Sequence, residues 1–180
     1  SPIAKAVLRE LRSNDLIDVR ASALASLAQN GDVTAKKELE RAAASKESPA
    51  LLAVDAALTR LGDEAAAARF AVRVREGSMP ARLAALEATK EFATAPPAVA
   101  RAIVGGLEDQ QAAVRAAAAQ AAGRLKIREA VPVLRRTLGQ PVSYLVKLSA
   151  AVSLHILGDP ARDDLLPQAL ARDMAEASVF

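Results

Sequence analysis

The sequence predicts an all-α fold of stacked antiparallel helical hairpins, an α-solenoid, and three of its features support this. Alanine, the residue with the highest helix propensity, supplies 44 of the 180 residues. Aromatic residues, which favour strands, make up only 2% of the chain. The chain also repeats itself every 31 to 33 residues, which is typical of proteins that stack one supersecondary unit on the next.

Each repeat is anchored by a residue that opens the apolar face of a first helix. The anchors are Val19, Ala50, Ala81, Val114 and Val146. Small or apolar residues recur 4, 7, 8 and 11 positions after most anchors, and these offsets share one face of an α-helix. Because most of these residues are small, the face allows another helix to approach closely.

Each first helix is predicted to end in a short turn that leads into a second helix. Twelve residues after their anchors stand Gly31, Gly62 and Gly158, where a helix C-terminus favours the left-handed conformation. The predicted N-caps of the second helices are Asp32, Asp63, Thr94 and Asp159. Each unit is therefore a hairpin with a very short turn.

The second helices carry apolar pairs at a spacing of four residues, which marks their buried face. These pairs are Leu39/Ala43, Phe70/Val74, Ile103/Leu107, Leu134/Leu138 and Leu166/Leu170. Prolines mark several boundaries: Ser48-Pro49 and Ser78 with Pro80 are predicted to start first helices. Pro132 and Pro167 are expected inside second helices, where they would bend them.

We expect a single domain over residues 1–180 with about eleven helices. Residues 2–12 look like the second helix of a unit without its first, so we expect a half-repeat at 1–13. The full repeats are then 14–45, 46–76, 77–109, 110–141 and 142–174. The chain starts at Ser1 without Met and at a half-repeat, which leaves open whether it is part of a larger protein.

Residues 113–125 (AVRAAAAQAAGRL) and 128–134 (REAVPVL) resemble the HEAT-repeat family, in particular its short repeats of about 31 residues found in phycobilisome lyases. Leu-Gly-Asp at 61–63 and 157–159 matches the middle of that pattern. The resemblance covers 14–174 and is weakest in the third repeat, and Asp55 in the second stands where small apolar residues are usual. It implies a right-handed superhelix that holds protein partners along the concave face of its second helices.

Several classes of chemistry are excluded by residue type. The chain has no Cys and one His, His155, so it has no disulfide, no catalytic thiol and no His-pair metal site. No phosphate-binding glycine loop or nucleophile elbow is present. We expect no metal, no cofactor and no enzymatic activity, and no apolar run is long enough to span a membrane.

Basic residues on the predicted exposed face of the second helices form the candidate partner-binding site. These candidates are Lys37, Arg41, Arg69, Arg101, Arg135 and Arg136, with Asp164 and Gln168 on the same face. An ordinary solvated face is the simpler interpretation, and an acidic protein partner is the functional one. A second basic set, on the first helices, is expected to pair with acids of adjacent turns: Arg20, Arg82, Arg115 and Lys147.

The sequence therefore predicts a non-catalytic scaffold that binds a protein partner, and two alternatives stay open. Residues 111–147 carry seven basic groups and one acidic group, which would suit nucleic acid. The chain could also be an accessory domain of a larger enzyme, such as a bilin-lyase-like protein. The absence of a visible signal peptide favours the cytoplasm, with the periplasm open for a processed chain. The composition is typical of a GC-rich bacterial genome, and the oligomeric state is left open.

Overall fold

The computed structural model describes residues 9–13, 16–44 and 51–160, which form helices and no strands. In chain order the first four hairpins are α2 (Ile17–Gln29) with α3 (Val33–Ala44), α4 (Leu51–Arg60) with α5 (Glu64–Arg75), α6 (Met79–Ala88) with α7 (Pro97–Gly106), and α8 (Ala112–Arg124) with α9 (Val131–Leu138). The helix α10 (Tyr144–Ile156) opens the fifth. The short 3-10 helix η1 (Thr89–Glu91) follows α6, and a second one, η2 (Arg128–Ala130), precedes α9.

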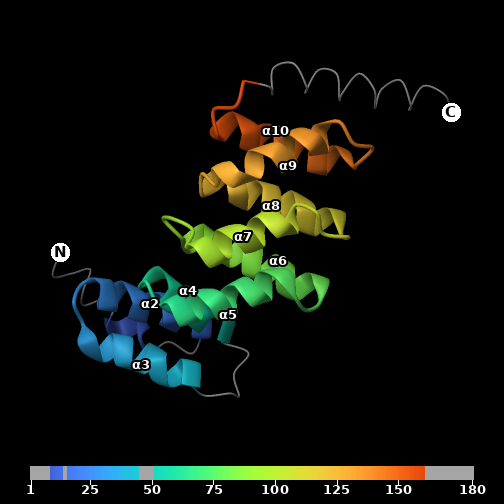
Figure 1. Ribbon diagram of the computed structural model, residues 1–180. Coiled ribbons are helices and arrows are strands. Elements are labelled where there is room, and N and C mark those ends of the chain that lie inside the picture. Colours follow the sequence, from blue (N-terminus) through green and yellow to red (C-terminus); the bar gives the residue numbers. More distant parts are fainter. Residues whose placement is uncertain (1–8, 14–15, 45–50, 161–180) are drawn as a thin grey trace.

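The hairpins stack in chain order, from α2 and α3 at one end of the described chain to α10 at the other (Figure 1). First helices pack on first helices, as α2 does on α4 and α8 on α10. The predicted all-α solenoid of helical hairpins is thereby confirmed.

The predicted inward faces are buried. In the fourth repeat the anchor Val114 and the residues at all four offsets, Ala118, Ala121, Ala122 and Leu125, are buried. Leu58 and Leu154, at equivalent positions of the second and fifth repeats, are 1% and 0% exposed. Asn30 and Ala81 are exposed exceptions. The register inferred from the repeat is therefore correct where the structure describes it.

The apolar core divides into two clusters. One joins α2, α3 and α4 through Leu24, Leu39 and Leu58. The other extends from α4 and α5 to α10, and in it the rings of Phe70 and Phe92 lie 5.0 Å apart. Between the second and third repeats α5 packs extensively on α7, whereas α4 and α6 touch little. The two first helices leave a hollow at this junction, described below.

The turns follow the predicted chemistry in most repeats. Gly31, Gly62 and Gly158 have φ of 89°, 83° and 71°, in the left-handed region that glycine adopts without a steric penalty. The Asp63 carboxylate accepts a hydrogen bond of 2.8 Å from the Ala66 amide, and Asp32 caps α3 in the same way. Ser78 caps α6, whose first turn holds Pro80.

The fourth repeat places a lysine where the first, second and fifth repeats have glycine. Lys126 lies twelve residues after its anchor and has φ of 55°, the only positive φ of a non-glycine residue in the described chain. The left-handed conformation costs an L-residue roughly 1–2 kcal/mol because Cβ crowds the following carbonyl. Nothing in the turn itself requires a lysine side chain.

Two boundary predictions need correction, and a third is not tested. Thr94 does not cap α7, because this helix starts at Pro97 after Pro96 and has no side-chain cap. Pro132 lies in the first turn of α9 and not in its interior, so its missing N–H breaks no helical hydrogen bond there. Asp159 accepts hydrogen bonds from Arg135, and the helix that it was predicted to cap lies outside the described residues.

Several other predictions also lie outside the described residues. They concern most of the helix at 2–12, Ser48-Pro49, Asp164, Leu166, Pro167, Gln168 and Leu170.

The small first-helix residues allow a close contact between α8 and α10. The Ser153 hydroxyl of α10 donates a hydrogen bond of 2.7 Å to the Ala119 carbonyl of α8. A Cβ at Gly123 would lie 2.9 Å from the Ser153 Cα, which is closer than real Cβ contacts allow. Glycine is therefore required at 123 by the approach of two backbones.

Candidate partner-binding face

The six candidate basic residues are exposed on second helices, as the repeat predicts. Lys37 and Arg41 lie on α3, Arg69 on α5, Arg101 on α7, and Arg135 and Arg136 on α9. Their ion pairs divide them into two groups of three.

Arg69, Arg135 and Arg136 are each paired with an acid of the same chain. The Arg69 Nε lies 2.8 Å from Oδ1 of Asp55, and the Arg135 Nη2 lies 2.8 Å from Oδ2 of Asp159. Arg136 pairs with Glu108. Since these guanidinium groups already neutralise acids, they offer a partner less free charge.

The pairing of Asp55 with two arginines is not predicted by the sequence. Asp55 lies on α4 with a side chain that is 1% exposed, between Arg69 and Arg73 of α5. A buried carboxylate requires charge compensation, and the two guanidinium groups supply it. The one signal in the sequence was that Asp55 breaks the apolar pattern of the repeat.

Lys37, Arg41 and Arg101 make no ion pair with any residue that the structure describes. They stand on α3 and α7, so the unpaired positive charge of the predicted face lies in the first and third repeats. Only three of the six predicted basic residues are therefore unpaired within the described residues.

Among the basic residues of the first helices, Arg82 pairs with an acid as predicted, whereas Arg115 binds backbone carbonyls. The Arg82 Nε lies 2.9 Å from Oδ2 of Asp109, in the loop before α8. Arg115 donates to the carbonyls of Asp109 and Gln110. Lys147 is 1% exposed and Arg20 is half-buried. Arg115 thereby contacts the end of the third repeat, and all four basic side chains are half-buried or buried.

The basic segment 111–147 does not form one continuous patch. Arg115, Arg135, Arg136 and Lys147 are paired or buried as described above. Arg124 is half-buried and donates a hydrogen bond of 2.6 Å to the Thr89 hydroxyl, and burial lowers the pKa of its guanidinium. Only Lys126 and Arg128 of this segment are exposed without an ion pair in the described residues.

A hollow of about 430 Å³ lies beside Arg101, between α7 and the turn that joins α8 to η2. We call it the α7 pocket. Its walls are mostly apolar, with two basic groups and one acidic group among the lining residues. These are Thr94, Ala95, Pro97, Ala100, Arg101, Val104, Leu125, Lys126, Ile127 and Glu129.

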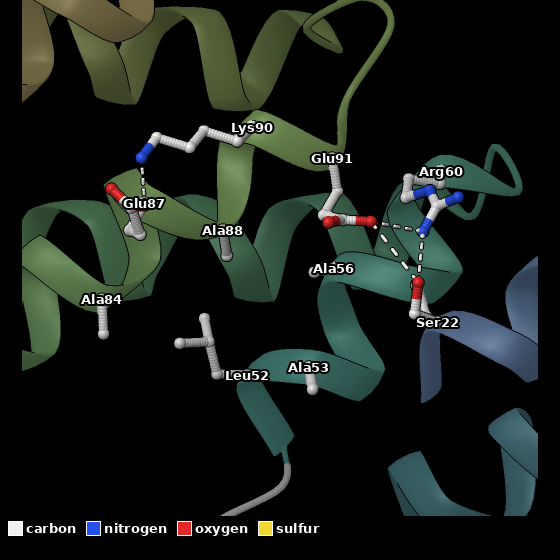
Figure 2. Close-up of a pocket in the computed structure, with 11 residues that line it drawn as sticks. Ser22, Leu52, Ala53, Ala56, Arg60, Ala84, Glu87, Ala88, Lys90 and Glu91 are labelled. Carbon is white, nitrogen blue, oxygen red and sulfur yellow. Dashed lines mark hydrogen bonds and ion pairs between the residues drawn. The ribbon is translucent and has the colours of Figure 1, made fainter. Parts of the chain in front are cut away.

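A second hollow of about 370 Å³ lies on the first-helix side, where α4 and α6 diverge (Figure 2). Leu52 and alanines of both helices line it. Its charged side chains pair with each other: Arg60 with Glu91 at 3.1 Å, and Lys90 with Glu87. The hollow therefore has a mostly apolar wall, and these four charged side chains neutralise each other in two ion pairs.

Neither a metal site nor a membrane span emerges from the described residues. No group of three or more His, Asp or Glu side chains in them could hold a metal ion. None of their helices is long and apolar enough to cross a bilayer.

Comparison with known families adds to this geometry. Residues 93–177 match the family model of HEAT repeats. The match begins just before α7, continues through α10 and supports the HEAT-repeat family, whose members are typically non-enzymatic protein-interaction scaffolds. It does not confirm the narrower resemblance to phycobilisome lyases. No curated protein shows significant similarity to the chain.

Proposed function

We propose that this HEAT-repeat chain is a non-catalytic scaffold that binds an acidic protein partner along the face of its second helices. One observation supports this most directly: Lys37, Arg41 and Arg101 are exposed and have no ion pair within the described residues. These three side chains form no salt bridge there. Arg69, Arg135 and Arg136, by contrast, each form one.

An array of unpaired cations gives electrostatic complementarity to an acidic surface. Such complementarity raises the association rate and rejects partners of the wrong charge more than it raises affinity. Each repeat packs on its neighbours, so the stacked helices place these charges along one extended surface. The surface therefore suits a protein partner that spans several repeats.

Nucleic acid is the weaker alternative. Binding to its backbone relies on several basic side chains that are free to neutralise phosphates. In the segment 111–147 only Lys126 and Arg128 remain exposed and unpaired within the described residues. The third interpretation, an accessory domain of a bilin-lyase-like enzyme, rests on the resemblance of the repeats alone.

Affinity capture from a lysate of the source organism tests the scaffold proposal. The chain would be compared with Lys37→Glu and Arg101→Glu, and with the triple variant Lys37→Glu/Arg41→Glu/Arg101→Glu. Arg128→Glu is the matched control, since Arg128 is exposed on η2, has no ion pair within the described residues, and its reversal changes the net charge by the same amount as each single variant.

We expect a protein that the unchanged chain and Arg128→Glu both retain after nuclease treatment, and that the triple variant loses. Equal capture by all variants would show that the charged side chains of the second helices contact solvent and not the partner. Loss of the captured material on nuclease treatment would instead favour nucleic acid.

A further inference from the structure

We propose that the α7 pocket binds an acidic peptide segment of the partner. An apolar side chain of the segment fills the hollow, and a neighbouring carboxylate pairs with Arg101 and Lys126. This inference rests on the proposed scaffold function and assigns it one specific site.

The walls of the α7 pocket suit an apolar side chain. Ala100 and Val104 of α7 are half-buried and face the hollow from one side. Leu125 and Ile127, on either side of Lys126, are 8% and 4% exposed and line the other side. The volume of about 430 Å³ falls within the roughly 300–1,000 Å³ of small-ligand sites.

The charges around the pocket select an acidic occupant. Arg101 and Lys126 line it, are exposed, and have no ion pair in the described part of the chain. A guanidinium can hold a carboxylate through two parallel hydrogen bonds, which fixes its orientation. Glu129 also lines the pocket and repels a second carboxylate at that edge. The occupant therefore presents its carboxylate toward Arg101 and Lys126.

The backbone at Lys126 gives independent support. The fold would be served better by glycine, because φ here is 55° and the equivalent turns have Gly31, Gly62 and Gly158. Residues in sparsely populated backbone conformations persist only where the surrounding structure holds them, and they concentrate at active sites and ligand clamps. Lys126 combines such a conformation with a place in the wall of the α7 pocket, as a residue that contacts a ligand would.

A peptide accounts for these features better than a free anion or a nucleic acid. Inorganic phosphate would leave the apolar walls of Val104, Leu125 and Ile127 unfilled. A nucleic acid would need a longer line of free cations, but Arg124 is half-buried against Thr89 and Arg136 is paired with Glu108. A peptide supplies both a carboxylate and an apolar side chain on one flexible backbone.

Selection from a phage-displayed library of random dodecapeptides tests the inference, with the whole chain immobilised. We expect enriched peptides to carry Asp or Glu within three positions of Leu, Ile, Met or Phe. In fluorescence anisotropy a synthetic copy of one such peptide should bind Arg101→Ala and Lys126→Gly at least ten-fold more weakly than the unchanged chain. Arg128→Ala is the matched control, because Arg128 is exposed on η2 but does not line the pocket.

Thermal unfolding separates binding from folding. Lys126→Gly should have a Tm equal to or above that of the unchanged chain, because glycine relieves the strain. Weaker peptide binding at an unchanged or higher Tm supports the site. A lower Tm would show that Lys126 serves the fold and would overturn the inference.

Three further results would also overturn it: no enriched peptide, enriched peptides without acidic residues, or binding that neither variant weakens. The scaffold proposal is tested separately, since Lys37 and Arg41 lie on α3 and do not line the pocket. A partner lost with Lys37→Glu but retained by Lys126→Gly would support the scaffold while refuting the pocket.

Discussion

At the residue scale, pairing decides which charges serve the fold and which stay available. Asp55 is the clearest case, because its carboxylate is buried between Arg69 and Arg73. Arg69 looks like a surface residue by periodicity and is 46% exposed, yet it compensates a buried charge. Reversing it would place a glutamate beside Asp55, so Arg69 is a poor position at which to test partner binding.

We predict that the double variant Arg69→Ala/Arg73→Ala is destabilised by about 3 kcal/mol, because it leaves the Asp55 carboxylate buried without compensation. Urea unfolding followed by circular dichroism measures this. The single variant Arg69→Ala should lose much less, since Arg73 remains 3.3 Å from the carboxylate. A double variant within about 0.5 kcal/mol of the unchanged chain would show that Asp55 needs neither arginine.

Asp32 makes part of the stability depend on pH. The Thr34 hydroxyl and the Ala35 amide donate to its carboxylate, and these hydrogen bonds hold its pKa below the ordinary value. Because the folded state has the lower pKa, this stabilisation is complete above the unfolded pKa of about 3.9 and is lost as the pH falls through the folded value.

We therefore expect the unchanged chain to be more stable than Asp32→Asn at pH 7, and the difference to shrink as the pH is lowered below about 4. Denaturant unfolding of both proteins at pH 7 and pH 3 measures this. A difference that stays constant between these pH values would mean that the ionised carboxylate contributes nothing as a cap.

At the element scale, small residues set how closely the helices pack. The hydrogen bond from Ser153 to the Ala119 carbonyl joins α10 to α8 and needs two backbones in near contact. Larger residues would separate the helices and lose this bond. Glycine and alanine on the first helices therefore act through their size as well as through helix propensity.

We predict that Gly123→Ala destabilises the chain by about 1–3 kcal/mol, because its Cβ would meet the Ser153 backbone and force α8 and α10 apart. Gly105→Ala is the matched control: it also lies in a helix, and its Cβ would meet nothing within 4 Å. Alanine at 105 should be neutral or stabilising by up to about 1 kcal/mol. Equal effects at both positions in thermal unfolding would refute the close contact.

At the scale of the whole molecule, each repeat is stabilised by its neighbours, so stability varies along the stack. The helix α8 packs on α6, α7 and α10 and buries seven of its residues. The helix α3, in the first described hairpin, buries only Ala35 and Leu39. The two apolar clusters place these helices in different parts of the core.

We expect amide hydrogen exchange, read by mass spectrometry of peptides, to be at least ten-fold slower in α8 than in α3. Segments with few buried contacts open more readily than segments that bury many residues against several neighbours. Uniform protection across the chain would show that the stack unfolds as one cooperative unit. That outcome would contradict the expectation of a gradient.

Most of the fold could be predicted from the sequence, whereas the candidate site could be predicted only in outline. The 31–33-residue period located the hairpins, and glycine and aspartate located the turns at 31–32 and 62–63. Thr94 and Pro132 were misplaced because the third repeat has extra residues around Pro96 and because a proline favours the first turn of a helix. The six basic candidates were correctly predicted to be exposed, but their partners were not predicted.

The sequence by itself determined the helical hairpins, their register and their short turns, because local propensity and periodicity act within one or two helices. Tertiary structure decided which charges remain free, since Asp55, Asp159 and Glu108 lie 14 to 28 residues from the arginines that they neutralise. It also brought α7 and Lys126 together around one hollow. Periodicity shows which face of a helix meets solvent, but the stacking of separate hairpins determines what lies across from that face.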